Sequence, residues 1–195
     1  MLRRRMMMDK GSVNQLLYIE GVDGAYINTN FIPTENTKIV AEVKFINTAG
    51  FYSFGSLERF SGNYKRWHFG VLNGNLQIDY NNKDMIIRTN DEEFHIFTIS
   101  KNRVSIDDNP KITSGIVTNK GTIPLYIFDR NSLLSTAQEY GSAQVKYFDI
   151  YENDELVRHY IPSYYNGVYC MYETVENKYY YNQGEGYFIG DVDNN

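Results

Sequence analysis

The chain has 195 residues, a net charge of -5 at pH 7 and an aromatic content of 15%, with 18 Tyr and 11 Phe. This length suits one well-packed domain, and the acidic balance gives no electrostatic footprint for nucleic acid. The single cysteine, Cys170, excludes an intrachain disulfide and a Cys-rich zinc site. We expect its side chain to be a small buried hydrophobe.

The first 15 residues form a separate basic segment. They contain four cationic side chains against one anionic side chain, together with three consecutive methionines. The basic start lacks the apolar run of a signal peptide, and no segment approaches the roughly 20 apolar residues that span a bilayer, so we expect neither secretion nor a membrane. We expect an extended arm that anchors the chain to a partner through Arg3, Arg4, Arg5, Met6, Met7 and Met8.

Period-2 alternation after the arm predicts antiparallel strands. In "IVAEVKFI", Ile39, Ala41, Val43 and Phe45 share one face, and "NLQIDY" at residues 75–80 alternates in the same way. Tight turns rich in Asn, Asp and Gly separate the segments. Further predicted strands are 16–22, 24–29, 51–57, 66–72, 84–89, 94–100, 103–106, 123–128, 143–151, 156–161, 167–172 and 178–181.

Two segments depart from this alternation. "IPLYIF" at residues 123–128 is apolar on both faces, which predicts a place in the middle of a sheet or under a covering loop. "SLLSTAQEYG" at residues 132–141 is the one stretch that suits a short helical turn or an irregular loop. The spacing of the strands predicts an all-β fold, a two-layer sandwich.

The order of the segments resembles a known family. "LLYIEGVDGAYINTNFIP", "PLYIFDRN" and "VKYFDIYENDELVRHYIPSYYNGVYCMYETVENKYYYNQGEGYF" are similar to concanavalin A-like, laminin-G-like jelly-roll modules of tailed-phage structural proteins and gut-bacterial surface proteins. The resemblance covers residues 17 to 190. It implies a two-sheet antiparallel β-sandwich over residues 16–195, after an arm of residues 1–15. Glu173 and Ser163 depart from the family's usual Asp and Cys.

The resemblance implies a function that does not involve catalysis. We expect a non-enzymatic virion component, a capsid-surface decoration or head fibre, whose partners are other virion proteins such as the major capsid or fibre protein. A bacterial carbohydrate-binding module is the alternative, and a glycoside hydrolase is a third hypothesis. Binding of a host-surface glycan and homo-oligomerisation both stay open at this stage.

Three carboxylates, Glu152, Asp154 and Glu155, cluster between two predicted strands. Asn153 and Asp154 suit a two-residue hairpin turn, because both residue types tolerate positive φ. The competing interpretation is the E-x-D-x-E motif of laminarinase-like glucanases, which places three carboxylates on one face of a strand. Leu156 occupies the third position, so the sequence favours the turn.

No cofactor is expected from the remaining polar residues. "IDDNPK" at residues 106–111, the "YNNKD" loop and Asp23 have acidic or Asn-rich character, but none offers the 6 to 8 oxygen ligands that calcium needs. Calcium is therefore unsupported, and 106–111 is interpreted as a turn. His68, His95 and His159 lack metal-ligand spacing and are interpreted as sheet-face residues.

Aromatic side chains are the remaining candidates for a binding site. Tyr64, Arg66 and Trp67 lie together in "YKRWHFG", where an exposed indole could stack on a sugar while the arginine donates hydrogen bonds. Packing of Trp67 in the core is the competing interpretation. The tyrosines at 164–165 and 179–181 alternate between the two faces of a strand, and an outward row of tyrosines suits an interface.

Overall fold

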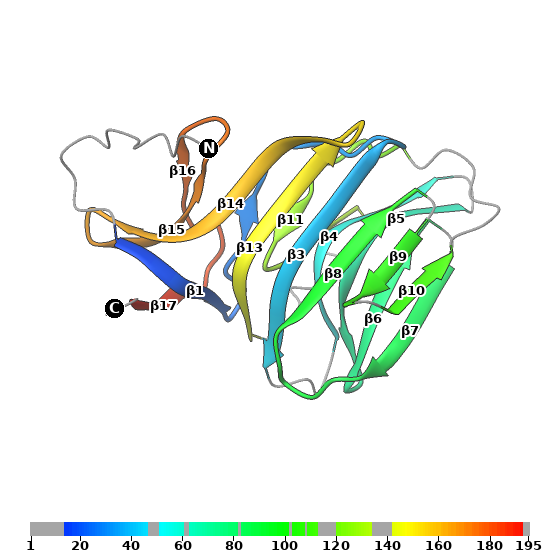
Figure 1. Ribbon diagram of the computed structural model, residues 1–195, viewed down its shortest axis with the longest axis horizontal. Helices are drawn as coiled ribbons and strands as arrows, with labels where there is room; N and C mark the ends of the chain where they lie inside the picture. Colours follow the sequence, from blue (N-terminus) through cyan, green and yellow to red (C-terminus); the bar gives the residue numbers. More distant parts are fainter. Residues whose placement is uncertain are drawn as a thin grey trace, which may run out of the picture.

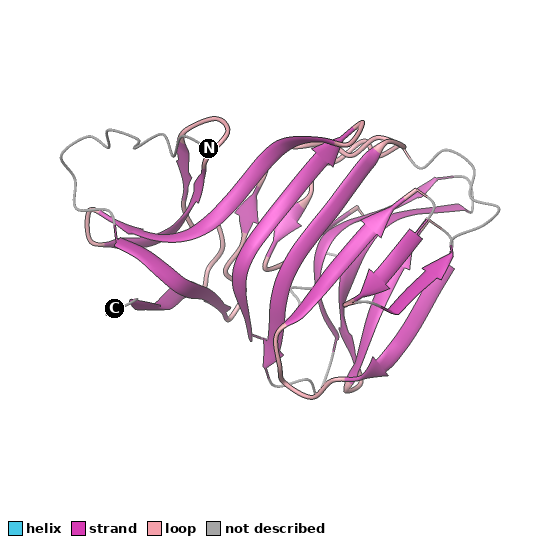
Figure 2. Cartoon of the chain, viewed as in Figure 1, coloured by secondary structure: helices cyan, strands magenta, loops and turns pink. Residues whose placement is uncertain are grey.

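A computed structural model describes residues 14–46, 51–60, 63–81, 83–101, 103–107, 109–112, 120–133 and 142–192. Regular structure within these ranges consists of strands, with no helix (Figure 2). The strands form two sheets that bury a common core (Figure 1). This is the two-layer arrangement that strands with one apolar face each adopt. The predicted all-β, jelly-roll type sandwich is confirmed.

The larger sheet has the strand order β10-β9-β8-β3-β13-β1-β14-β15-β16, with β17 paired to β1 and a further pairing between β13 and β14. All of its pairings are antiparallel. Its strands are β1 (Asn14–Val22), β3 (Thr37–Ile46), β8 (His95–Ser100), β9 (Arg103–Ile106), β10 (Asn109–Ile112), β13 (Ser142–Glu152), β14 (Glu155–Tyr165), β15 (Val168–Glu173), β16 (Lys178–Tyr180) and β17 (Tyr187–Val192).

The smaller sheet has the order β2-β11-β4-β5-β6-β7, with β12 paired to β4. The β12–β4 pairing is parallel, and the others are antiparallel. Its strands are β2 (Ile27–Asn28), β4 (Phe51–Phe60), β5 (Asn63–Leu72), β6 (Asn75–Tyr80), β7 (Lys83–Thr89), β11 (Tyr126–Ile127) and β12 (Arg130–Ser132).

The larger sheet extends past the smaller one at one end. Figure 1 shows β15, β16 and β17, together with β1, at the end of the molecule away from β5, β6 and β7. We call β15, β16, β17, β1 and the adjoining half of β14 the terminal lobe. Asn14 and Gln15, which the sequence assigns to the arm, already belong to this lobe, because they pair with Tyr164 and Ser163 of β14.

The hydrophobic core between the sheets is aromatic. The ring of Phe69 on β5 stacks between Phe54 on β4, at 5.4 Å, and Phe97 on β8, at 4.7 Å. Phe45 on β3 contacts Phe54 edge to face at 5.6 Å, so both sheets contribute to one cluster. Aromatic side chains bury a large apolar area each, so they contribute most of the stabilisation of such a core.

Asparagine and aspartate set the tight turns between paired strands. Asn153 and Asp154 both have positive φ, 52° and 63°, between β13 and β14. Asn73 with Gly74 and Asn166 with Gly167 repeat the pattern, with positive φ at both positions. Two successive positive φ values define the turn whose twist matches that of a hairpin, so the predicted turn at residues 153–154 is confirmed.

Several local predictions differ from the structure. Only Tyr126–Ile127 of "IPLYIF" forms a strand, near the sheet edge rather than in its middle, and Phe128 turns away with φ 69°. Within "IDDNPK", Asp107 has positive φ as a turn residue should, but the chain then enters β10, which the sequence did not predict. Pro110 is tolerated there because β10 is an edge strand. Strand β17 was also missed, and residues 134–141 lie outside the described ranges.

Candidate functional site

Trp67 lies in the core and not on a binding surface. Its side chain is 0% exposed, and its ring meets Tyr80 edge to face at 4.7 Å. Arg66, the preceding residue on β5, lies on the other face of the strand, with its guanidinium 4.2 Å from the centre of the Tyr64 ring. The competing interpretation, packing of Trp67 in the core, is therefore confirmed, and stacking of a sugar on its indole is wrong, because alternation along β5 directs the indole toward the opposing sheet.

The carboxylates of the β13–β14 turn are divided among different partners. Glu152 accepts hydrogen bonds from the hydroxyls of Thr34 and, at 2.7 Å, Thr37. Asp154 forms an ion pair with Lys38 at 3.7 Å. Glu152 and Asp154 therefore contact different groups, and Glu155 is exposed, so the three carboxylates are not gathered around one partner.

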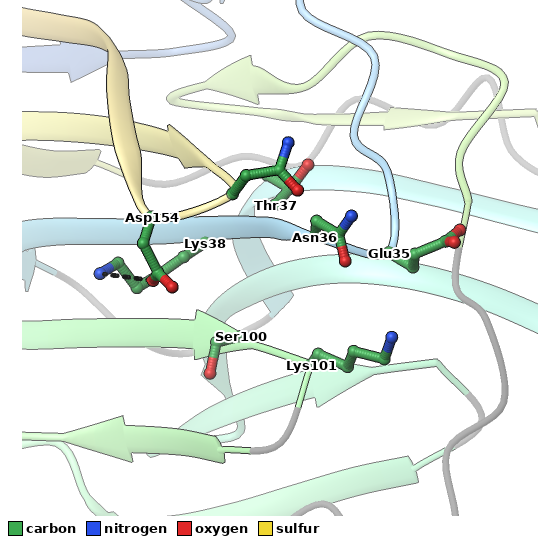
Figure 3. A pocket seen from close by; sticks show the side chains of 8 residues that line it. Glu35, Asn36, Thr37, Lys38, Ser100, Lys101 and Asp154 are labelled. Carbon is green, nitrogen blue, oxygen red and sulfur yellow. Dashed lines mark ion pairs between the residues drawn. The ribbon is translucent and has the colours of Figure 1, made fainter.

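A polar hollow of about 420 Å³ lies beside this turn (Figure 3). Three turns meet around it: the approach to β3, the β8–β9 turn and the β13–β14 turn. The hollow offers hydroxyl, amide, carboxylate and ammonium groups, which suit a hydrated polar ligand. Its lining residues are Glu35, Asn36, Thr37, Lys38, Ser100, Lys101, Asn153 and Asp154.

Two of the histidines form direct cross-strand pairs with aspartates. His68 on β5 lies opposite Asp79 on β6, with Nε2 3.3 Å from the carboxylate. Because a carboxylate only accepts, Nε2–H donates. Burial, with the charges of Arg130 and Arg66, lowers the pKa of His68 well below its usual value, so its imidazole is neutral.

The pKa of His159 is shifted in the direction opposite to that of His68. Its Nδ1 donates to Asp149 at 2.5 Å, from β14 to β13. This hydrogen bond raises the pKa of His159. The expectation of ordinary sheet-face histidines missed these pairings, because they depend on strand register rather than on sequence spacing.

His95 lies between two aspartates. Its Nε2 is 2.7 Å from Asp91 and its Nδ1 is 3.0 Å from Asp107, while the Arg88 guanidinium is 3.2 Å from Asp107. These contacts fasten the start of β8 to the turn that follows β9. No cluster of His, Cys, Asp and Glu side chains with the geometry of a metal site occurs in the described part of the chain.

Tyrosines gather on the outward face of the terminal lobe. Tyr165 and Tyr179 stack with centroids 4.2 Å apart and planes 5° apart, and Tyr172 contacts Tyr179 at 4.9 Å. Tyr181 and Val168 are 41% and 49% exposed. We call Tyr165, Val168, Tyr172, Tyr179 and Tyr181 the tyrosine face.

Cys170 lies beneath the tyrosine face. Its side chain is 0% exposed, and burial raises the pKa of its thiol to about 11. The prediction of a buried apolar cysteine is confirmed. Alternation sends Met171 and Tyr180 into the core and leaves Tyr172 and Tyr179 on the other side of the sheet.

The six predicted anchoring residues, Arg3 to Met8, lie outside the described ranges. No helix among the described residues is long and apolar enough to cross a membrane. No family model matches the chain, and no curated protein was found as a relative.

Proposed function

We propose that this chain is a non-enzymatic structural protein of a tailed-phage virion that attaches to a neighbouring virion protein through the tyrosine face. The resemblance of its strand order to phage jelly-roll modules motivates the virion as its location. The tyrosine face is the observation that supports attachment. A capsid-surface decoration and a head fibre are both compatible with this role.

The composition of the face suits protein recognition. Tyrosine gives a large contact area at low cost in side-chain entropy, and its hydroxyl can hydrogen-bond at the wet edge of an interface. The mutual stacking of Tyr165 and Tyr179 covers one face of each ring. Val168 and Tyr181, which are exposed, and the half-buried rings of Tyr165 and Tyr179 then offer a contact surface to a partner protein.

A buried carboxylate supports the strands that carry the tyrosine face. Glu173 is 0% exposed, and its carboxylate accepts from three backbone N–H groups, those of His159, Val175 and Glu176, at 2.8, 2.9 and 2.6 Å. This carboxylate orders the β15–β16 turn, which supports the strands of the tyrosine face. It therefore acts as a structural group.

Mass spectrometry of purified phage particles tests the proposal. The chain should be present at a fixed copy number relative to the major capsid protein after repeated gradient purification. Its absence from particles, with abundance only in the infected-cell lysate, would overturn the proposal. Light scattering of the purified chain measures its oligomeric state separately. A tyrosine face that binds a second copy of the chain would produce a dimer in this measurement.

A further inference from the structure

The outer face of the larger sheet carries a trough of about 430 Å³. It lies over β3, β8 and β9, on the side opposite the core. The trough adjoins the polar hollow of Figure 3, since Lys38 and Ser100 line both. We call it the hydroxyl trough; its lining residues are Lys38, Ile96, Thr98, Ser100, Arg103, Ser105 and Asp107.

Strand register explains the shape of the trough. Thr98 pairs with Ser105, and Ser100 pairs with Arg103, so three of these four outward positions on β8 and β9, Thr98, Ser100 and Ser105, have short side chains. Longer side chains flank them, with Arg103 at one end and Ile96 and Asp107 at the other. Ser105 is only 4% exposed although it faces outward, which places it at the bottom of the trough.

The floor supplies hydrogen-bonding groups. Ser100 Oγ donates to the Arg103 carbonyl at 2.8 Å and keeps its acceptor lone pairs. The hydroxyls of Thr98 and Ser105 have no hydrogen-bond partner among the described residues. A ligand with many hydroxyl groups can satisfy both, because a hydroxyl donates one hydrogen bond and accepts others.

The unbalanced charge in the trough is positive. Asp107 is already engaged by His95, Arg88 and the Ile96 N–H, which donates at 3.0 Å. Lys38 is shared between Asp154 and the Tyr151 ring, whose centre is 4.2 Å away. Arg103 has no ion-pair partner in the described ranges. A carboxylate on the ligand can form a bidentate ion pair with the Arg103 guanidinium.

The sheet also argues against a peptide in the trough. Strand β8 is paired with β3 on one side and β9 on the other, and β9 is paired with β8 and β10. The floor therefore has no open edge to which a peptide could add as a strand. Side-chain hydroxyls and a cation remain as its means of recognition.

We propose that the hydroxyl trough binds an acidic oligosaccharide, whose hydroxyls contact Thr98, Ser100 and Ser105 and whose carboxylate pairs with Arg103. This binding site is additional to the attachment surface and uses a different sheet region. Unlike the sugar-stacking site expected at Trp67, this site has no aromatic ring on which a sugar would stack.

Binding of tetragalacturonate, sialyllactose and a heparin-derived tetrasaccharide to the full-length chain, measured by calorimetry, tests this site. Fully methyl-esterified tetragalacturonate and lactose are the neutral controls for the first two ligands, and tetraglutamate is the peptide control. At least one acidic glycan should bind, and its neutral counterpart should bind at least about tenfold more weakly, as expected for loss of a charged hydrogen bond. Binding of no acidic glycan in this panel, or equal binding of tetraglutamate, would overturn the proposal.

Two variants locate the ligand. Arg103→Gln should lower affinity for the acidic glycan about tenfold or more, whereas Arg59→Gln, an exposed arginine on β4, should not change it. Thr98→Val with Ser105→Ala keeps the strand but removes two hydroxyls, so it should weaken acidic and neutral glycans alike. Wild-type affinity in both trough variants, with unchanged thermal unfolding, would place binding elsewhere and contradict the site.

Discussion

His159 and Asp149 form a hydrogen bond of 2.5 Å across the β13–β14 hairpin, from the imidazole Nδ1 to the carboxylate. The bond favours the protonated imidazole and raises the pKa of His159 in the folded chain. Its stabilisation is fully present below the unfolded-state pKa, about 6.5, and is lost as pH rises through the folded-state pKa. The unfolding free energy of wild type minus that of His159→Gln should therefore fall with rising pH above about 6.5.

His68 should show the opposite pH dependence. Its folded-state pKa is lowered by burial and by Arg130 and Arg66, so the folded chain keeps it neutral. Below about pH 6.5 the unfolded chain binds the proton more readily, and stability is lost as pH falls toward the folded-state pKa. Urea titrations of wild type and His68→Gln across pH 5 to 8 measure this difference. A difference independent of pH would contradict the neutral assignment.

Glu173 should be important for stability but not for binding. Glu173→Ala leaves three backbone N–H groups without their buried acceptor, which should lower the unfolding free energy by about 3 kcal/mol. Glu173→Gln keeps one acceptor oxygen and should cost less. Chemical denaturation measures both changes, with the exposed Glu155→Gln as control. Equal stability of Glu173→Ala and wild type would show that solvent replaces the carboxylate.

The carboxylates of the β13–β14 turn should have unequal effects. Glu152→Gln weakens the hydrogen bonds from Thr34 and Thr37 and should lower the unfolding free energy by about 1 kcal/mol. Asp154→Asn and Glu155→Gln should have no measurable effect, because exposed charges contribute little. Thermal unfolding of the three single variants separates these cases. If Asp154→Asn were the most destabilising, the turn would depend on the Lys38 ion pair instead.

Cys170 should resist modification in the native chain. Its thiol is fully buried and has a pKa raised to about 11, so little thiolate forms at pH 8. Ellman's reagent should react with it only after denaturant is added. Rapid reaction in the native state would indicate that the strands beneath the tyrosine face open readily.

Local sequence pattern predicts the strands well where one face is buried. The alternation from Ile39 to Phe45 predicts β3, and Asn153 with Asp154 predicts the turn of the β13–β14 hairpin, because both signals are local. Strand β17 follows a Gly-rich segment and depends on pairing with β1, far away in the chain. Its pairing is long-range, so sequence pattern alone does not identify it.

The binding surfaces were less predictable than the fold. The outward tyrosines of β14 and β16 follow from alternation, but their stacking depends on the position of β15 between them. The hydroxyl trough depends on register, since Thr98 and Ser105 become neighbours only when β8 and β9 pair. For Trp67 the sequence left core packing and sugar stacking both open, because residue type alone does not determine which face of β5 is buried.

Particle incorporation of variants of the tyrosine face tests the central claim most directly. Val168→Asp with Tyr181→Asp places charges at exposed positions of the face, so the purified chain should stay folded while an apolar interface is disrupted. The control is Ile32→Asp with Leu156→Asp, which changes two exposed apolar residues outside the face. Quantitative mass spectrometry of purified particles should show the control at wild-type copy number and the tyrosine-face variant strongly depleted. Wild-type copy number of the tyrosine-face variant would contradict attachment through this surface.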